Sequence, residues 1–253
     1  EYSRSTLKRF NEFNLNIRSD CTGDRKEFST QVQRRQENID DLTFQVAVID
    51  RDGLLAYSNL AKPSDRTDLS QREHFRVHKD AGNADHLFVS RPLKGKVSGK
   101  WSIQMTRPIF ADGQFNGVLV ISVSPDQFAG FAENLRLAKD STLTVLRNSG
   151  EIMARYPAIE GSLGVIIKGA DYLTNEAPPA GNFSIPGQID GKERIYGYYR
   201  LPEYGMTFVL GEAINAVLEP YRAHRQSVLL GASGISVMAL LLFLMLYRSL
   251  LSL

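Results

Sequence analysis

The chain has 253 residues, a formal net charge of +2 and a hydrophobic content of 43%. A charge so close to zero, without a basic aromatic motif, argues against a nucleic-acid-binding protein. Because Cys21 is the single cysteine, no intrachain disulfide can form and the paired-cysteine zinc patterns are excluded.

Residues 1–42 are predicted to be helical, since Leu7, Phe10, Phe13 and Ile17 recur at helical spacing. Polar residues around 19–24 interrupt the pattern, so we expect two helices or one bent helix. The apolar stripe has to bury against the following sheet or against a second copy of itself. The chain begins at a glutamate, and we therefore expect a fragment whose routing signal lay upstream.

A unit of antiparallel strands follows the leading segment. Alternating β-branched residues predict a strand over 43–50, a turn at Asp52-Gly53 and a return strand over 54–59. Ser70 is expected to cap a short helix that carries Glu73 at its third position. Further strands are expected at 86–90, 101–110 and 115–124, before a helix over 126–137.

The same pattern then appears a second time. A hairpin over 142–147 and 151–155 is followed by an irregular stretch over 157–180 and by strands at 182–185, 193–201 and 206–211. Self-similarity on this scale indicates two structural units of one type in tandem. Antiparallel sheets with short helices over one face give an α+β fold.

The C-terminal part of the chain is strongly apolar. Residues 228–247 include no charged side chain, and about twenty residues at about 1.5 Å rise match a hydrocarbon core of about 30 Å. A connecting helix over 214–227, broken or bent at Pro220, is expected to lead into this span. The alternative, a core helix of a soluble protein, is disfavoured because the segment has no polar face.

Several short motifs, in this order and spacing, resemble the double Cache (PDC, PAS-like) sensor domains of bacterial membrane receptors. The versions most similar are those that precede GGDEF diguanylate cyclase or histidine kinase domains. The motifs that carry the resemblance are Asp68-Leu69-Ser70, Arg72 to Arg76 with His78, Phe88 to Pro92, Ser98 to Trp101, Thr106 to Ile109 and Asp112 to Val118.

The resemblance implies a periplasmic sensor anchored in the bacterial inner membrane, with a membrane-distal unit over 43–138 and a membrane-proximal unit over 139–213. In this family the distal unit usually holds a small ligand, the proximal unit relays, and the leading helix often forms a homodimer. The implied function is ligand sensing, relayed through the last span to a cytoplasmic output domain. A diguanylate cyclase (c-di-GMP signalling) is the expected output, with a histidine kinase or chemoreceptor as the alternative.

The ligand site is predicted on the strand 101–110, where Trp101, Met105 and Arg107 share one face. An arginine can bind a carboxylate in a bidentate manner, and an indole can wall off an apolar portion. A small carboxylate or an amino acid is therefore the expected ligand. The remaining candidate contacts are Phe75, Arg76, His78 and Asp126.

Catalytic and metal chemistry are not expected. His74 and His78 are spaced i, i+4, but no third ligand is evident. We find no nucleophile-elbow pattern and no complete phosphate loop, so neither an enzyme nor a cofactor is predicted for this fragment. A ligand-free dimerisation module and a membrane-anchored hydrolase remain as rival functions.

Overall fold

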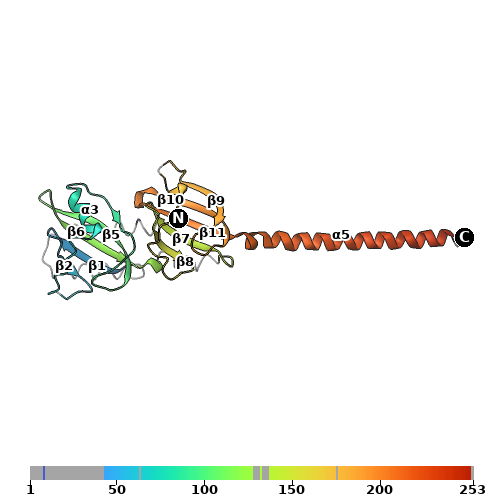
Figure 1. Ribbon diagram of the computed structural model, residues 1–253, viewed down its shortest axis with the longest axis horizontal. Helices are drawn as coiled ribbons and strands as arrows, with labels where there is room; N and C mark the ends of the chain where they lie inside the picture. Colours follow the sequence, from blue (N-terminus) through green and yellow to red (C-terminus); the bar gives the residue numbers. More distant parts are fainter. Residues whose placement is uncertain are drawn as a thin grey trace.

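The computed structural model describes residues 43–62, 64–127, 137–174 and 176–251, together with Lys8 and Ala132. The predicted helix over 1–42, with Cys21, lies outside these residues, as does most of the predicted helix over 126–137. Two sheet units follow one another along the molecule, and a long helix extends from the second (Figure 1). The predicted α+β class, with two antiparallel-sheet units and a C-terminal apolar helix, is confirmed, while the unit boundaries at 138 and 139 stay a prediction.

The first unit is a six-stranded antiparallel sheet with the strand order β2-β1-β6-β5-β3, in which β4 also pairs with β5. Its elements are β1 (Thr43–Asp50), β2 (Leu55–Ser58), α3 (Glu73–Asp80), β3 (Phe88–Val89), β4 (Leu93–Lys94), β5 (Trp101–Ala111) and β6 (Gln114–Val123). The expected strand over 86–90 is thus only two residues long.

The second unit is a five-stranded antiparallel sheet with the order β8-β7-β11-β10-β9. Its elements are β7 (Thr142–Arg147), β8 (Ile152–Tyr156), the 3-10 helix η1 (Asp171–Leu173), β9 (Ala180–Pro186), β10 (Glu193–Leu201), the 3-10 helix η2 (Pro202–Tyr204) and β11 (Met206–Ala213). In both sheets the first hairpin of the unit lies at one edge. Beside it lie, in order across the sheet, the last strand of the unit, the strand before it and a strand from the middle of the unit. The repeat seen in the sequence is therefore a repeat of topology.

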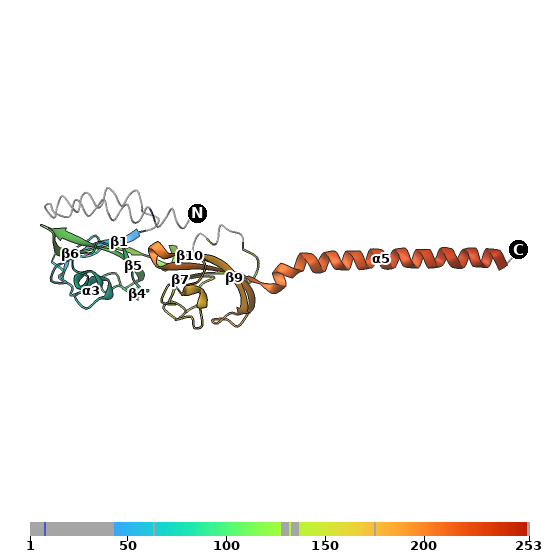
Figure 2. The same cartoon turned by 90° about the horizontal axis from the view of Figure 1, so that it is seen from above.

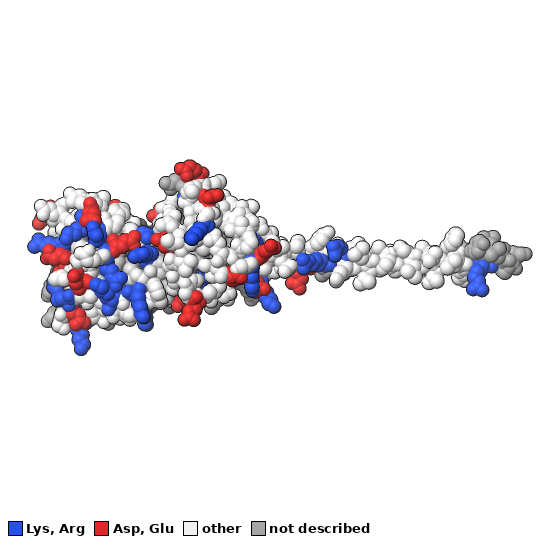
Figure 3. All heavy atoms as spheres, in the orientation of Figure 1, with Lys and Arg blue, Asp and Glu red and all other residues white. Residues whose placement is uncertain are grey.

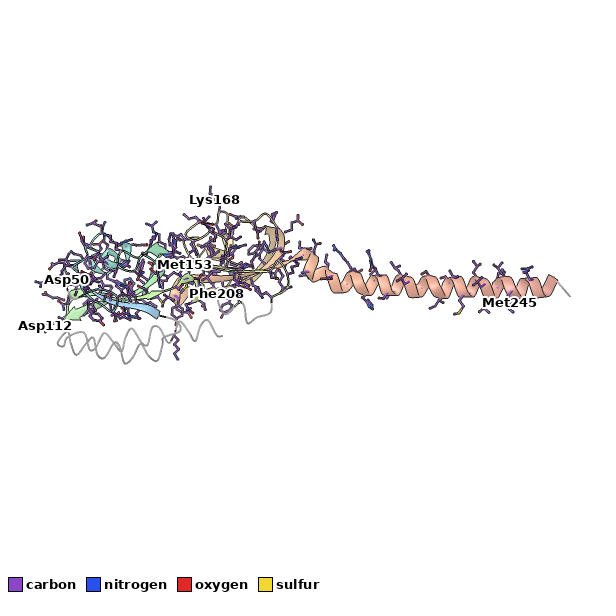
Figure 4. The ribbon with its side chains drawn as sticks, turned by 90° about the horizontal axis from the view of Figure 1, so that it is seen from below. Asp50, Asp112, Met153, Lys168, Phe208 and Met245 are labelled. Carbon is purple, nitrogen blue, oxygen red and sulfur yellow. The ribbon has the colours of Figure 1, made fainter. Side chains whose placement is uncertain are left out.

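Each sheet has one covered face of its own and one face in a shared core. Phe75 of α3 packs with Ile49, Leu55 and Val120 on one face of the first sheet. The opposite face belongs to a cluster that joins both units and contains Ile103, Met105, Ile121, Val145, Met153 and Met206. In Figure 4 the labelled Met153 and Phe208 lie where the second unit meets the first, and Lys168 lies at the upper edge of the second unit.

One sequence-based prediction about a helix end needs correction. Ser70 does not cap the helix, because α3 begins at Glu73 with Arg72 at the N-cap position. The Ser70 backbone N–H instead donates to Asp68 Oδ1 at 2.8 Å, which is an Asx turn. The capping-box spacing is present in the sequence, but Ser70 takes part in this turn and the helix begins only at Glu73.

The predicted connecting helix and membrane span form a single helix, α5 (Ile214–Leu251), which Pro220 does not break. Figure 2 shows a bend in its first turns, the region that contains Pro220, as expected where a proline removes one backbone hydrogen bond. From Ile214 to Met245 the helix is long and apolar enough to cross a membrane, with a mean hydropathy of 2.4 over its most apolar window. Charged side chains lie near the two ends of α5 and are absent along its middle (Figure 3).

Candidate functional site

A cavity in the first unit lies between the sheet and the segments that cover it. Its floor is mixed: Gln45, Gln104 and Ser122 of β1, β5 and β6 form a polar part, and Ala47, Leu55 and Val120 form an apolar part. Ser122 Oγ donates to Gln104 Oε1 at 2.6 Å, and Gln45 Nε2 donates to Ser58 Oγ at 2.9 Å. Amide and hydroxyl groups in such a network can both donate and accept, so the polar part of the floor suits a neutral or zwitterionic ligand.

The loop that follows β4 closes the cavity from above. Gly95, Lys96 and Val97 line it, and two hydrogen bonds hold the loop in place. Lys96 Nζ donates to the Asp68 carbonyl at 2.7 Å, and Arg72 Nη2 donates to the Lys94 carbonyl at 3.4 Å. Both cationic side chains thus stand at the cavity, where they could meet a carboxylate.

Two buried histidines of α3 lie beside this cavity. His74 lines it, and its Nδ1 has no hydrogen-bond partner among the described residues. His78 Nε2 is 2.9 Å from Thr106 Oγ1. Burial lowers the pKa of both imidazoles to about 4, so both are neutral at physiological pH.

The structure separates the predicted ligand contacts from this cavity. Trp101 is half exposed, and Met105 is buried in the core shared by both units. Arg107 Nη1 bonds Asp85 Oδ1 at 2.6 Å. None of the three lines this cavity, and their role toward a ligand stays a prediction.

The predicted contacts and the cavity lie apart because they belong to different faces of β5. Alternation correctly places Trp101, Met105 and Arg107 on one face and Gln104 on the other. However, α3 covers the Gln104 face, since Thr106 contacts both His74 and His78. Which face a helix covers depends on the path of the chain, and period-two alternation carries no such information.

Of the other predicted contacts, Phe75, Arg76 and Asp126 do not line the cavity either. Phe75 is fully buried and packs edge-on against Phe115 with ring centroids 5.9 Å apart. Arg76 is exposed beside Asp80. Asp126 follows β6 and its backbone N–H donates to Ser124 Oγ at 3.3 Å. The sequence analysis missed Gln45, Gln104 and Ser122, although polar residues inside apolar strands were the signal that could have found them.

The cavity is small in this structure. Its volume is about 40 Å³, whereas pockets for drug-sized ligands measure about 300–1,000 Å³. An amino acid would therefore require the loop over 95–100 to move outward.

The second unit has a cavity of similar size on the corresponding face of its sheet, lined by Arg155 and by aromatic side chains of η1, β9 and β10. Metal ligation has no support in the described part of the chain, where no group of three or more His, Cys, Asp or Glu side chains could hold an ion.

Comparisons with known proteins show which solved structures share this fold. No protein-family model matches the chain, and a search of curated proteins finds no match. Solved structures do match. The extracellular domain assigned to the histidine kinase rpHK1S-Z16 aligns with a TM-score of 0.76 at 24% identity, over 86% of this chain and 91% of that chain.

Two chemoreceptor domains of Pseudomonas aeruginosa are similar as well. The ligand-binding domain of PctC in complex with GABA gives a TM-score of 0.60 at 16% identity, over 83% of this chain and 93% of that chain. The PctB domain in complex with L-Gln gives 0.64 at 14% identity, over 84% and 85%. The chain therefore has the double Cache fold of extracellular ligand-binding domains.

Proposed function

We propose that this chain is the extracytoplasmic ligand-sensing region of a membrane-bound signalling receptor. The observation that carries the proposal is the double Cache fold joined without a gap to a helix that can span a membrane, since β11 ends at Ala213 and α5 begins at Ile214. Any displacement of β11 would therefore reach the span directly. The solved domains of similar fold include amino acid chemoreceptors, which supports a small carboxylate or amino acid as the ligand.

The link between the two units supports a relay. Arg147 of β7 bonds Glu73 of α3, with its Nη2 3.1 Å from Glu73 Oε1. The same guanidinium stacks over the Phe88 ring at 5.1 Å. Because α3 covers the distal cavity, a ligand that shifts α3 would act on the second unit through this contact. Signal transfer further requires that the ligand bind one arrangement more tightly than the other.

The proposal is tested by thermal melting of the full chain in nanodiscs with a panel of amino acids and carboxylates. A ligand that binds only the folded protein raises the melting temperature by mass action, by an amount equivalent to about 2.7 kcal/mol at a hundredfold excess over Kd. Gln104→Leu, which alters the cavity floor, should abolish that shift, and Gln114→Leu on the exposed start of β6 should not. A shift that Gln104→Leu leaves intact would place the ligand elsewhere.

One observation favours a second function, a dimerisation module that binds no ligand. The distal cavity measures only about 40 Å³, far less than the roughly 300–1,000 Å³ of pockets for drug-sized ligands. This alternative predicts no melting shift with any member of the panel and a dimer whose dissociation constant is independent of metabolites. Analytical ultracentrifugation of the same sample separates the two cases.

The proposal also covers the location and the assembly of the whole receptor. The sensor units would lie in the periplasm, the span would cross the inner membrane, and the receptor would act as a homodimer. Output through a diguanylate cyclase, a histidine kinase or a chemoreceptor domain is decided by the sequence that follows the span in the full-length protein.

A further inference from the structure

The cavity in the second unit has a chemistry different from that of the first. Its volume is about 50 Å³ and it lies between the sheet and the segment around η1. The only ionisable side chains that line it are Arg155, Tyr172 and Tyr196. The rest of the lining is mainly aliphatic and aromatic: Leu146, Ile167, Phe183, Ile185, Ile189 and Val209.

Arg155 is buried without a full set of partners. Its side chain is 7% exposed. Nη1 donates to Thr144 Oγ1 at 3.1 Å and Nη2 to Asp190 Oδ2 at 3.2 Å, but Nε has no partner among the described residues. A buried donor left unsatisfied is destabilising, and more so on a charged group, so an acceptor at this point would be stabilising.

A cluster of three charged side chains lies beside the cavity. Asp190 is shared with a second buried arginine, because Arg194 Nη1 and Nη2 bond its two oxygens at 2.7 Å each. Two guanidinium groups thus share one carboxylate as their ion-pair partner among the described residues. Consistent with this, burial lowers the pKa of Arg155, and the Arg194 hydrogen bonds lower the pKa of Asp190 to about 2.

An aromatic wall stands next to this charge. Tyr172 stacks on Phe183 with ring centroids 4.7 Å apart, and Phe183 stacks on Tyr196 at 5.1 Å. The polar groups of Gln188 are occupied, since its amide exchanges two hydrogen bonds with the Lys168 backbone. An occupant would therefore meet a cation at one end and apolar surface elsewhere.

We propose that the membrane-proximal unit holds a second site, in which Arg155 binds the carboxylate of a short-chain monocarboxylate and the aromatic wall contacts its alkyl end. The size of the cavity fits this class. A cavity of about 50 Å³ is far smaller than the roughly 300–1,000 Å³ of pockets for drug-sized ligands, which favours the shortest members of the class. The site is independent of the distal cavity, because the two lie on different sheets.

The test is isothermal titration calorimetry of the full chain in nanodiscs with sodium acetate and sodium propionate, against sodium chloride at equal ionic strength. We expect saturable binding of the carboxylates and at least tenfold weaker binding to Arg155→Gln. Arg200→Gln is the matched control, because Arg200 is a buried arginine of the same unit that does not line the cavity. It should bind acetate as the unchanged chain does.

A second variant covers the case in which Arg155→Gln does not fold. Ile185 is 40% exposed at the edge of the cavity, so Ile185→Trp should fold normally and obstruct the site. It is expected to weaken acetate binding at least tenfold while the melting temperature of the chain without acetate stays unchanged. Equal heats with acetate and chloride, or carboxylate binding that neither variant weakens, would overturn the proposal.

Discussion

The two units share a strand order but differ in what they bury on the covered face of the sheet. The first buries a neutral network of amide and hydroxyl groups around Gln104, together with two neutral histidines. The second buries two arginines around one carboxylate, beside stacked aromatic rings. The same strand order thus supports a neutral buried network in one unit and a charged one in the other, because the chemistry of a site depends on its side chains and not on its fold.

The largest predicted difference between the units is their response to acid. The pKa of His74 and of His78 falls from about 6.5 to about 4 on folding, so the unfolded chain binds protons first as the pH drops. Their stabilising contribution is complete above about pH 6.5 and is lost as the pH falls to about 4, at up to about 3 kcal/mol for each histidine. Urea unfolding of the first unit, followed by fluorescence of the single tryptophan, Trp101, should show this loss.

The second unit should keep its folding stability to a lower pH than the first. The pKa of Asp190 is lowered to about 2 by its hydrogen bonds to Arg194, so its contribution is present above about pH 4 and is lost only toward pH 2. Tyrosine absorbance of the same samples reports mainly on this unit. A double variant His74→Gln with His78→Gln should flatten the acid response of the first unit. If both units lose stability together near pH 5, the comparison fails.

The next largest effect on the free energy of unfolding is expected from removal of the carboxylate that Arg155 and Arg194 share. Asp190→Ala leaves Arg155 and Arg194 buried without a counter-ion, and we expect a loss of about 3–5 kcal/mol in the free energy of unfolding. The matched change in the first unit is Asp85→Ala. Asp85 pairs with Arg107, which is less deeply buried than Arg155 and Arg194. A loss of only about 1 kcal/mol is expected there. Comparable losses for the two variants, measured by urea unfolding, would contradict this ranking.

A smaller effect concerns the contact between the units. Arg147→Ala removes the ion pair with Glu73 and the stacking on Phe88, for which we expect a loss of about 1 kcal/mol. A double-mutant cycle with Glu73→Ala should give a coupling energy of about 0.5–1 kcal/mol. A coupling energy of zero would mean that this contact transmits nothing between the units.

The smallest effect is expected at Arg76, which the sequence analysis had placed at the ligand. Its side chain is exposed and forms an i,i+4 pair with Asp80 at 3.7 Å. Arg76→Ala should change stability by at most about 0.5 kcal/mol, and it should leave the melting shift with any ligand unchanged. A lost ligand response in this variant would restore the original assignment.

Prediction from sequence succeeded where a pattern is local and failed where it depends on neighbours distant in the chain. The strands β1, β5, β7 and β11 follow from alternation and turn residues, and their ranges agree closely with the predicted ones. The polar part of the distal cavity's floor and the pairing of Arg155 with Asp190, 35 positions away, do not. Both depend on which strand lies beside which.

The sequence by itself determined the duplicated unit, the α+β class and the apolar span, since periodicity and the length of an uncharged run follow directly from the order of residues. Only the tertiary structure decided which sheet face carries each cavity and which charges lie together. The physical reason is that burial and electrostatic compensation arise from three-dimensional neighbours, and in these sheets the neighbours come from opposite ends of each unit.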